Sequence, residues 1–156
     1  MRMVFLLIFM AIIVFGKEGE IYQDKKNGLI WQNNSEVGIV TKSWIDMNKK
    51  SAKKCFFIGD QESCADHSGD TAYGYCKALR LGGFSDWRLP TIKELSSLYQ
   101  TSSHLNKSAG TFWSDTSDTY KGKPCEAAFV LVSNKKGESF IVTRDKNVKN
   151  FVRCVR

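Results

Sequence analysis

The pattern of apolar and polar residues predicts strands at the start of the chain, followed by two helices. Two short β-prone runs, 21–23 and 29–32, flank Asn27-Gly28, a hairpin turn signal because both residues tolerate positive φ. Apolar residues at helical spacing predict a helix over about 71–80, before two glycines. A second helix is expected to begin at Thr91.

Thr91-Ile92-Lys93-Glu94 has the pattern of a capping box, in which Thr91 accepts from the Glu94 amide and Glu94 reaches back to the Thr91 amide. The apolar stripe of this helix is formed by Ile92, Leu95, Leu98 and Tyr99. Between residues 36 and 54 the pattern is less regular, and a helix anchored by Trp44, Ile45 and Met47 is expected there.

The second half of the chain predicts strands, which we expect at 111–114, 127–132, 139–143 and 151–156. The middle two runs flank a polar turn and read as a hairpin. Strands, two helices and further strands are the order of an α+β domain with a mostly antiparallel sheet.

The N-terminus reads as a secretory signal. After Met1 and Arg2, residues 3–15 are apolar without interruption, and Gly16 precedes a charged stretch. The run is short for a spanning helix, which needs about 20 apolar residues. We therefore expect cleavage after Gly16 and an exported, periplasmic or surface-located domain over 17–156.

The chain is basic, with a formal net charge of +7. This excess favours acidic partners such as anionic polysaccharides or phospholipid surfaces, and export makes nucleic acid the least favoured of them. High aromatic content and scarce proline are typical of a folded domain.

Five cysteines follow the signal: Cys55, Cys64, Cys76, Cys125 and Cys154. In an oxidising compartment pairing is the default, and an odd number leaves one thiol over. Residues alone leave the arrangement open: a local Cys55–Cys64 bridge or a long-range bridge to Cys154 are both compatible with the spacing. None of the spacings is typical of zinc.

Several strings together resemble one bacterial family. They are Asn27-Gly28-Leu29-Ile30-Trp31-Gln32, the run from Leu81 to Thr91 with Glu94-Leu95, Phe112-Trp113-Ser114 and Val152-Arg153-Cys154-Val155. Over essentially the whole mature chain, the sequence is similar to the C-terminal domain of the Legionella collagen-like protein. The segment 53–69 is longer than the resemblance implies and reads as an insertion.

The resemblance implies a C-type-lectin-like fold, with two helices flanking a small, mostly antiparallel sheet and neighbouring termini. It also implies a bridge from the first helix to the last strand, hence Cys76 with Cys154. Cys55 with Cys64 then falls in the insertion, and Cys125 is left over or bridges to a second chain. One family member is an adhesin for sulfated polysaccharides, which implies a binding role.

The most recognisable residues of the family motif read as structural. Trp87 and Leu89 are expected in the core, and Asp86 and Arg88 are expected to satisfy the backbone or each other. The motif residues with this expected role are Trp31, Asp86, Trp87, Arg88, Pro90, Thr91, Glu94 and Trp113.

Five lysines around Trp44 form the candidate anion-binding surface: Lys42, Lys49, Lys50, Lys53 and Lys54. Lys135, Lys136, Lys146, Lys149, Arg153 and Arg156 extend this surface if they share its face. An acidic stretch within 60–70 is the alternative site, for calcium, but a solvated loop is the favoured interpretation because its spacing does not match an EF-hand.

The sequence contains none of the common catalytic motifs, such as a nucleophile elbow or a phosphate-binding glycine loop. We therefore expect neither an enzyme nor a cofactor. The preferred function is a non-catalytic binding module for an anionic glycan or another envelope component. The alternatives are a structural subunit of the envelope that uses Cys125 between chains and a cysteine-dependent enzyme related to formylglycine-generating enzymes.

Overall fold

The computed structural model describes residues 19–45, 56–58, 61–63, 70–101, 105, 108–120, 123–134, 136 and 138–156. Within them lie two helices, α1 (Ala72–Ala78) and α2 (Ile92–Thr101), and three antiparallel or mixed sheets. The predicted α+β class is confirmed. None of the described helices has the length and apolar character needed to cross a membrane. The predicted signal segment, 1–16, lies outside the described residues.

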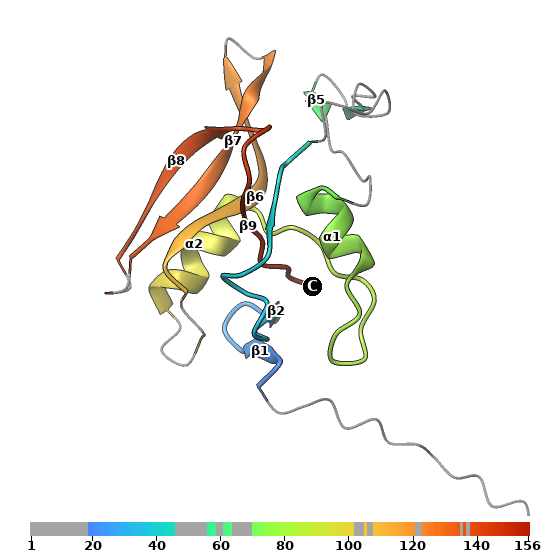
Figure 1. Ribbon diagram of the computed structural model, residues 1–156, viewed down its shortest axis with the longest axis vertical. Coiled ribbons are helices and arrows are strands. Elements are labelled where there is room, and N and C mark those ends of the chain that lie inside the picture. The colour runs from blue at the N-terminus through green and yellow to red at the C-terminus, as the bar shows by residue number, and fades with distance from the viewer. Residues whose placement is uncertain are drawn as a thin grey trace, which may run out of the picture.

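The main sheet has five strands in the order β3-β9-β6-β7-β8 (Figure 1). Its strands are β3 (Thr41–Lys42), β6 (Gly110–Tyr120), β7 (Lys123–Ser133), β8 (Ser139–Asp145) and β9 (Asn150–Phe151). All neighbours pair antiparallel except β6 and β9, which pair in parallel. The predicted hairpin of β7 and β8 is confirmed, with Val130 opposite Val142.

The predicted N-terminal hairpin is also confirmed, as β1 (Ile21–Asp24) and β2 (Leu29–Gln32). Gly28 has φ 71°, the left-handed conformation that glycine adopts readily. The C-terminal segment runs beside this hairpin: Ile30 and Arg156 exchange two backbone hydrogen bonds of 2.9 Å. The two ends of the domain therefore lie together.

The helices are short because specific residues begin and end them. Thr71 caps α1 by accepting from the Gly74 amide at 3.1 Å, and α1 ends at Ala78, close to the predicted boundary. In α2 the predicted stripe is confirmed, since Leu95, Leu98 and Tyr99 are buried. Figure 1 shows α2 behind the sheet and α1 beyond the β3 edge.

The sheet separates two apolar clusters. On one face, Trp44 and Trp87 pack with α1 and with Trp113, and on the other face Trp31 and Phe112 pack with α2. Burying these rings removes a large apolar area from water, which is the main driving force of the fold.

Two predicted elements differ in the structure. Within the expected helix of 36–54, residues 41–42 form β3 and Trp44 lies in a bend, while 46–54 lies outside the described residues. The strand predicted at 151–156 is limited to Asn150–Phe151, and Val155 instead makes single bridges to Trp31 and Arg88. Both differences arise because this part of the chain pairs with distant segments. In the insertion, β4 (Phe56–Ile58) and β5 (Gln61–Ser63) pair antiparallel.

Candidate functional site

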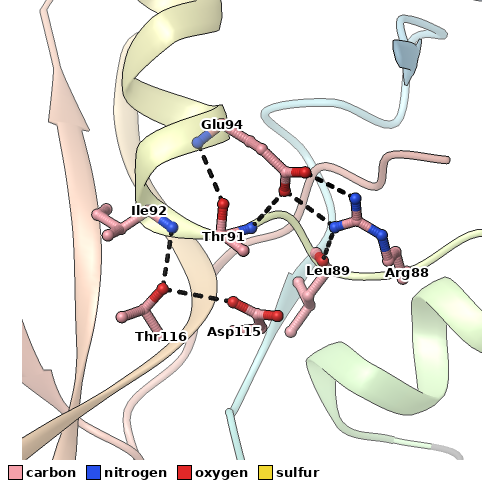
Figure 2. Close-up of polar contacts among 7 residues, drawn as sticks. All are labelled: Arg88, Leu89, Thr91, Ile92, Glu94, Asp115 and Thr116. Atoms are coloured by element: carbon pink, nitrogen blue, oxygen red, sulfur yellow. Dashed lines mark hydrogen bonds and ion pairs between the residues drawn. The ribbon is translucent and has the colours of Figure 1, made fainter. Parts of the chain in front are cut away.

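The family motif leads directly into the first turn of α2. Arg88 donates two hydrogen bonds to Glu94, from Nη1 to Oε2 at 2.9 Å and from Nη2 to Oε1 at 2.7 Å. Its Nη1 also donates to the Leu89 carbonyl. Glu94 accepts from the Thr91 amide at 2.8 Å, and Thr91 Oγ1 accepts from the Glu94 amide at 3.2 Å (Figure 2). The predicted capping box is confirmed, and its glutamate additionally orients an arginine.

Asp86 and Arg88 do not pair with each other, but the alternative expectation, a bond to the backbone, is confirmed for Arg88, which donates to the Leu89 carbonyl. Asp86 accepts from Arg156, with Nε–Oδ1 at 2.6 Å and Nη2–Oδ2 at 3.0 Å, whereas Arg88 pairs with Glu94. The reason is the bridge between Arg88 and Val155, which brings the C-terminal residue beside Asp86. The hydrogen bonds from the arginines lower the pKa of the Asp86 and Glu94 carboxyls.

The tryptophans of the motif, Trp31, Trp87 and Trp113, are all buried, as is Pro90. The Trp113 indole donates to the Lys42 carbonyl at 2.7 Å, which ties β6 to β3. These residues therefore stabilise the core of the domain and expose little surface to a ligand.

The predicted lysine surface is described only at Lys42, whose ammonium forms an ion pair of 2.5 Å with Asp70. Lys49, Lys50, Lys53 and Lys54 lie outside the described residues. That part of the surface stays a prediction.

The extension of this surface to Lys146 and Arg153 is wrong. Lys146 is 2% exposed, lies 4.3 Å from the ring centroid of Trp44 and donates to Ser117 Oγ at 2.7 Å. Arg153 is fully buried, with its Cζ 5.6 Å from the Tyr99 ring centroid. Aromatic faces attract cations, which allows both side chains to lie inside the domain. Neither can meet a polysaccharide.

A different basic surface is present where the β1–β2 turn lies against α2. Lys93, Ser97 and Thr101 recur at every fourth position of α2 and therefore share one helix face. Asn27 of the turn donates from Nδ2 to Ser97 Oγ at 3.4 Å. Lys25 and Lys26 precede it. We name the residues 22–27, Lys93, Ser97 and Thr101 the hairpin–helix surface.

Two hollows lie in the hairpin–helix surface. One, of about 370 Å³, is lined by residues 22–26 and Thr101. The other, of about 350 Å³, is lined by Asn27, Leu29, Lys93, Glu94 and Ser97. Both hollows are lined by lysines and uncharged hydrogen-bonding groups, together with one carboxylate each, Asp24 in the first and Glu94 in the second.

Sequence reasoning assigned residues 25–28 only to a turn. The lysines were visible there, and Lys93 was visible beside the apolar stripe. What the sequence does not show is that the turn packs across this helix face, because that contact joins residues 70 positions apart.

The predicted Cys76–Cys154 disulfide is present and joins α1 to the C-terminal segment. Cys125 lies in β7, while Cys55 and Cys64 lie outside the described residues. Among the described residues, no group of three metal-ligating side chains is placed to hold a metal ion. Most of the acidic stretch proposed for calcium lies outside them as well.

The fold and the bridge define a class, namely small disulfide-linked α+β domains whose motif residues organise their own core. The chain belongs to the Lcl C-terminal domain family, whose model matches residues 20–156. The resemblance seen in the sequence is thereby confirmed. Neither a curated protein nor a solved structure matches this chain.

Proposed function

We propose that this domain is an exported, non-catalytic binding module that holds anionic polysaccharides on its hairpin–helix surface. The observation that carries the proposal is the grouping of Lys25, Lys26 and Lys93 around two hollows that also contain amide and hydroxyl groups. Ammonium groups attract sulfate or carboxylate groups, and amide and hydroxyl groups between them suit the hydroxyls of a sugar chain.

The acidic residues near these lysines are already engaged. Asp24 accepts from the Lys26 amide at 3.1 Å and from Asn27 Nδ2 at 2.7 Å, and Glu94 is held by Arg88. The donors to Asp24 are neutral and leave its charge in place, whereas Arg88 neutralises Glu94. Lys25, Lys26 and Lys93 therefore face one remaining carboxylate, and the surface stays positively charged on balance. Because exposed charges are screened over about 8 Å at physiological salt, binding is expected to weaken steeply as salt rises.

Export is proposed from the N-terminal apolar run and fits a buried disulfide, since such bridges persist in oxidising compartments. A C-type-lectin-like arrangement is proposed from the neighbouring ends of the domain and from the bridge between α1 and the C-terminal segment. An experimental structure superimposed on C-type lectin domains tests the arrangement.

Heparin-column retention tests the proposed ligand class. The wild type should be retained at low salt and released at moderate salt. The variant Lys25→Ala/Lys26→Ala/Lys93→Ala should elute much earlier than the matched variant Lys136→Ala/Arg144→Ala/Lys149→Ala, which removes the same charge from other exposed positions. Equal elution of the two variants would place binding elsewhere.

A further variant lacking Lys49, Lys50, Lys53 and Lys54 tests the other candidate surface. If it alone loses retention, the ligand class stands and the hairpin–helix surface is the wrong location. Wild type that passes through at low salt would refute both.

A second candidate function is an envelope assembly subunit, favoured by the odd number of cysteines. Non-reducing electrophoresis should then show a disulfide-linked dimer that disappears in Cys125→Ser. A monomer in both proteins would argue against this function.

A further inference from the structure

A separate hollow of about 230 Å³ lies between α1, the family motif and β6. Its lining residues are Tyr73, Lys77, Trp87, Arg88, Leu89 and Asp115. It is smaller than the roughly 300–1,000 Å³ of pockets for drug-sized ligands, so it suits a single small molecule or one ring of a longer one. Its walls combine apolar rings with a carboxylate and cationic groups.

The walls of this hollow are held in place by contacts with each other and with neighbouring residues. The Tyr73 hydroxyl donates to the Asp115 carbonyl at 3.2 Å, and its ring stands edge-on to Trp44 with centroids 4.9 Å apart. The Asp115 amide donates to the Pro90 carbonyl at 2.8 Å. A ligand would therefore meet a site that needs little reorganisation, which limits the entropic cost of binding.

Asp115 offers the acceptor of the hollow. Among the described residues, its carboxylate receives one long hydrogen bond, from Thr116 Oγ1 to Oδ1 at 3.4 Å. Figure 2 shows the second carboxylate oxygen without a bond to any residue drawn. An ionised carboxylate has about four acceptor positions, so a half-buried one with a single weak partner favours donors from a ligand.

The cationic groups of the hollow differ from each other. Arg88 is occupied by Glu94, whereas Lys77 is exposed and, within the described part of the chain, has no acceptor in hydrogen-bond reach. Lys77 and Tyr73 lie four residues apart on one face of α1. An ammonium donor thus stands at the rim beside the tyrosine ring.

These charges decide the class of ligand. A cationic ligand would face the Lys77 ammonium, and an anionic one would face the Asp115 carboxylate, so a like charge opposes each of them. A neutral polyol avoids both repulsions. Its hydroxyls can donate to Asp115 and accept from Lys77, while an apolar ring face packs against Tyr73.

We propose that the hollow between α1 and β6 binds one neutral sugar ring, with Asp115 and Lys77 fixing its hydroxyls. This site is distinct from the hairpin–helix surface and does not depend on the anionic-polysaccharide proposal. Because the ligand is uncharged, its affinity should be nearly the same at low and moderate salt, unlike heparin retention.

The test is a titration of the ¹⁵N-labelled protein with D-glucose, D-galactose, D-mannose and N-acetyl-D-glucosamine, followed through amide shifts. At least one sugar should give saturable shifts centred on Tyr73, Lys77 and Asp115. Asp115→Asn should weaken that binding about tenfold, because an amide oxygen is a weaker acceptor than a carboxylate oxygen and the amide nitrogen cannot accept.

Lys77→Ala serves as the second variant, because an exposed side chain can be removed without disturbing the core, and Lys149→Ala is its control. Lys77→Ala should weaken binding and Lys149→Ala should not. The proposal is overturned if no sugar gives saturable shifts, if the shifts centre elsewhere, or if both Asp115→Asn and Lys77→Ala bind as tightly as the wild type.

Discussion

Replacing both Cys76 and Cys154 by alanine should remove a large share of the stability of the domain. Both residues are fully buried, and the bridge between them closes a loop with a sequence separation of 78. In the chain-entropy treatment, a cross-link of this span destabilises the unfolded state by about 4.5 kcal/mol at 25 °C.

Two further effects bear on this value. Loss of the buried sulfur atoms leaves small cavities, which adds to the destabilisation. Residual structure in the unfolded chain already restricts it, which reduces the benefit of the bridge. We therefore expect a net loss of about 3–5 kcal/mol, a large fraction of the roughly 5–15 kcal/mol typical of a folded domain.

Urea unfolding of the wild type and the Cys76→Ala/Cys154→Ala variant checks this expectation. The midpoint should fall, and the dependence of the unfolding free energy on urea should steepen, because an unbridged chain exposes more surface when it unfolds. With a reductant strong enough to open the bridge, the wild type should approach the variant. A loss below about 1 kcal/mol with an unchanged urea dependence would refute a bridge that acts on the unfolded chain.

Three other substitutions test the described contacts. Thr91→Ala should cost about 0.5–2 kcal/mol in urea unfolding through loss of the α2 cap, and an equally stable variant would mean that the cap is dispensable. Gly110→Ala should lower the free energy of unfolding by about 1–3 kcal/mol, because an added Cβ collides with the Phe151 ring. Gly83→Ala should lower it less, since Gly83 faces open space. Equal melting temperatures of the two variants would contradict this. Asp115 and Glu94 should respond oppositely to pH. Burial raises the pKa of Asp115, so its ionisation destabilises the fold as pH rises, while the Arg88 hydrogen bond lowers the pKa of Glu94, whose contribution is lost as pH falls below about 4.5. As pH rises from acid to neutral, Asp115→Asn should therefore become more stable relative to the wild type, and Glu94→Gln should become less stable relative to it. Stability–pH profiles of both variants that run parallel to that of the wild type would refute both assignments.

Local chemistry made some elements predictable from the sequence. The capping box at Thr91 and Glu94 needs only neighbouring residues, so its hydrogen bonds could be predicted before any fold was known. The same holds for the β7–β8 hairpin, whose strands are joined by a short polar turn. In both cases the partners are close along the chain.

The parts that were mispredicted depend on distant partners. Asp86 finds Arg156 across 70 residues, and β3 forms at Thr41–Lys42 because β9 pairs with it. A helical or strand pattern cannot reveal such a partner, since it reports only which face of a segment is apolar. The hairpin–helix surface was missed for the same reason.

The structure shows that the net charge of +7 overstates the number of cations that a ligand can reach. Each cation counts equally in the sequence, yet Arg153 is enclosed by aromatic rings and Lys146 lies against Trp44. Arg153 precedes the bridged Cys154, and both neighbouring residues of this segment are buried as well. Side chains on either face of the segment are therefore enclosed, and Arg153 has no solvent-facing position. The field that an acidic polymer meets is set by the cations left outside, and their positions around the β1–β2 turn matter more than the total. A charge-matched pair of variants is therefore a sharper test of polysaccharide binding than any measurement of overall basicity.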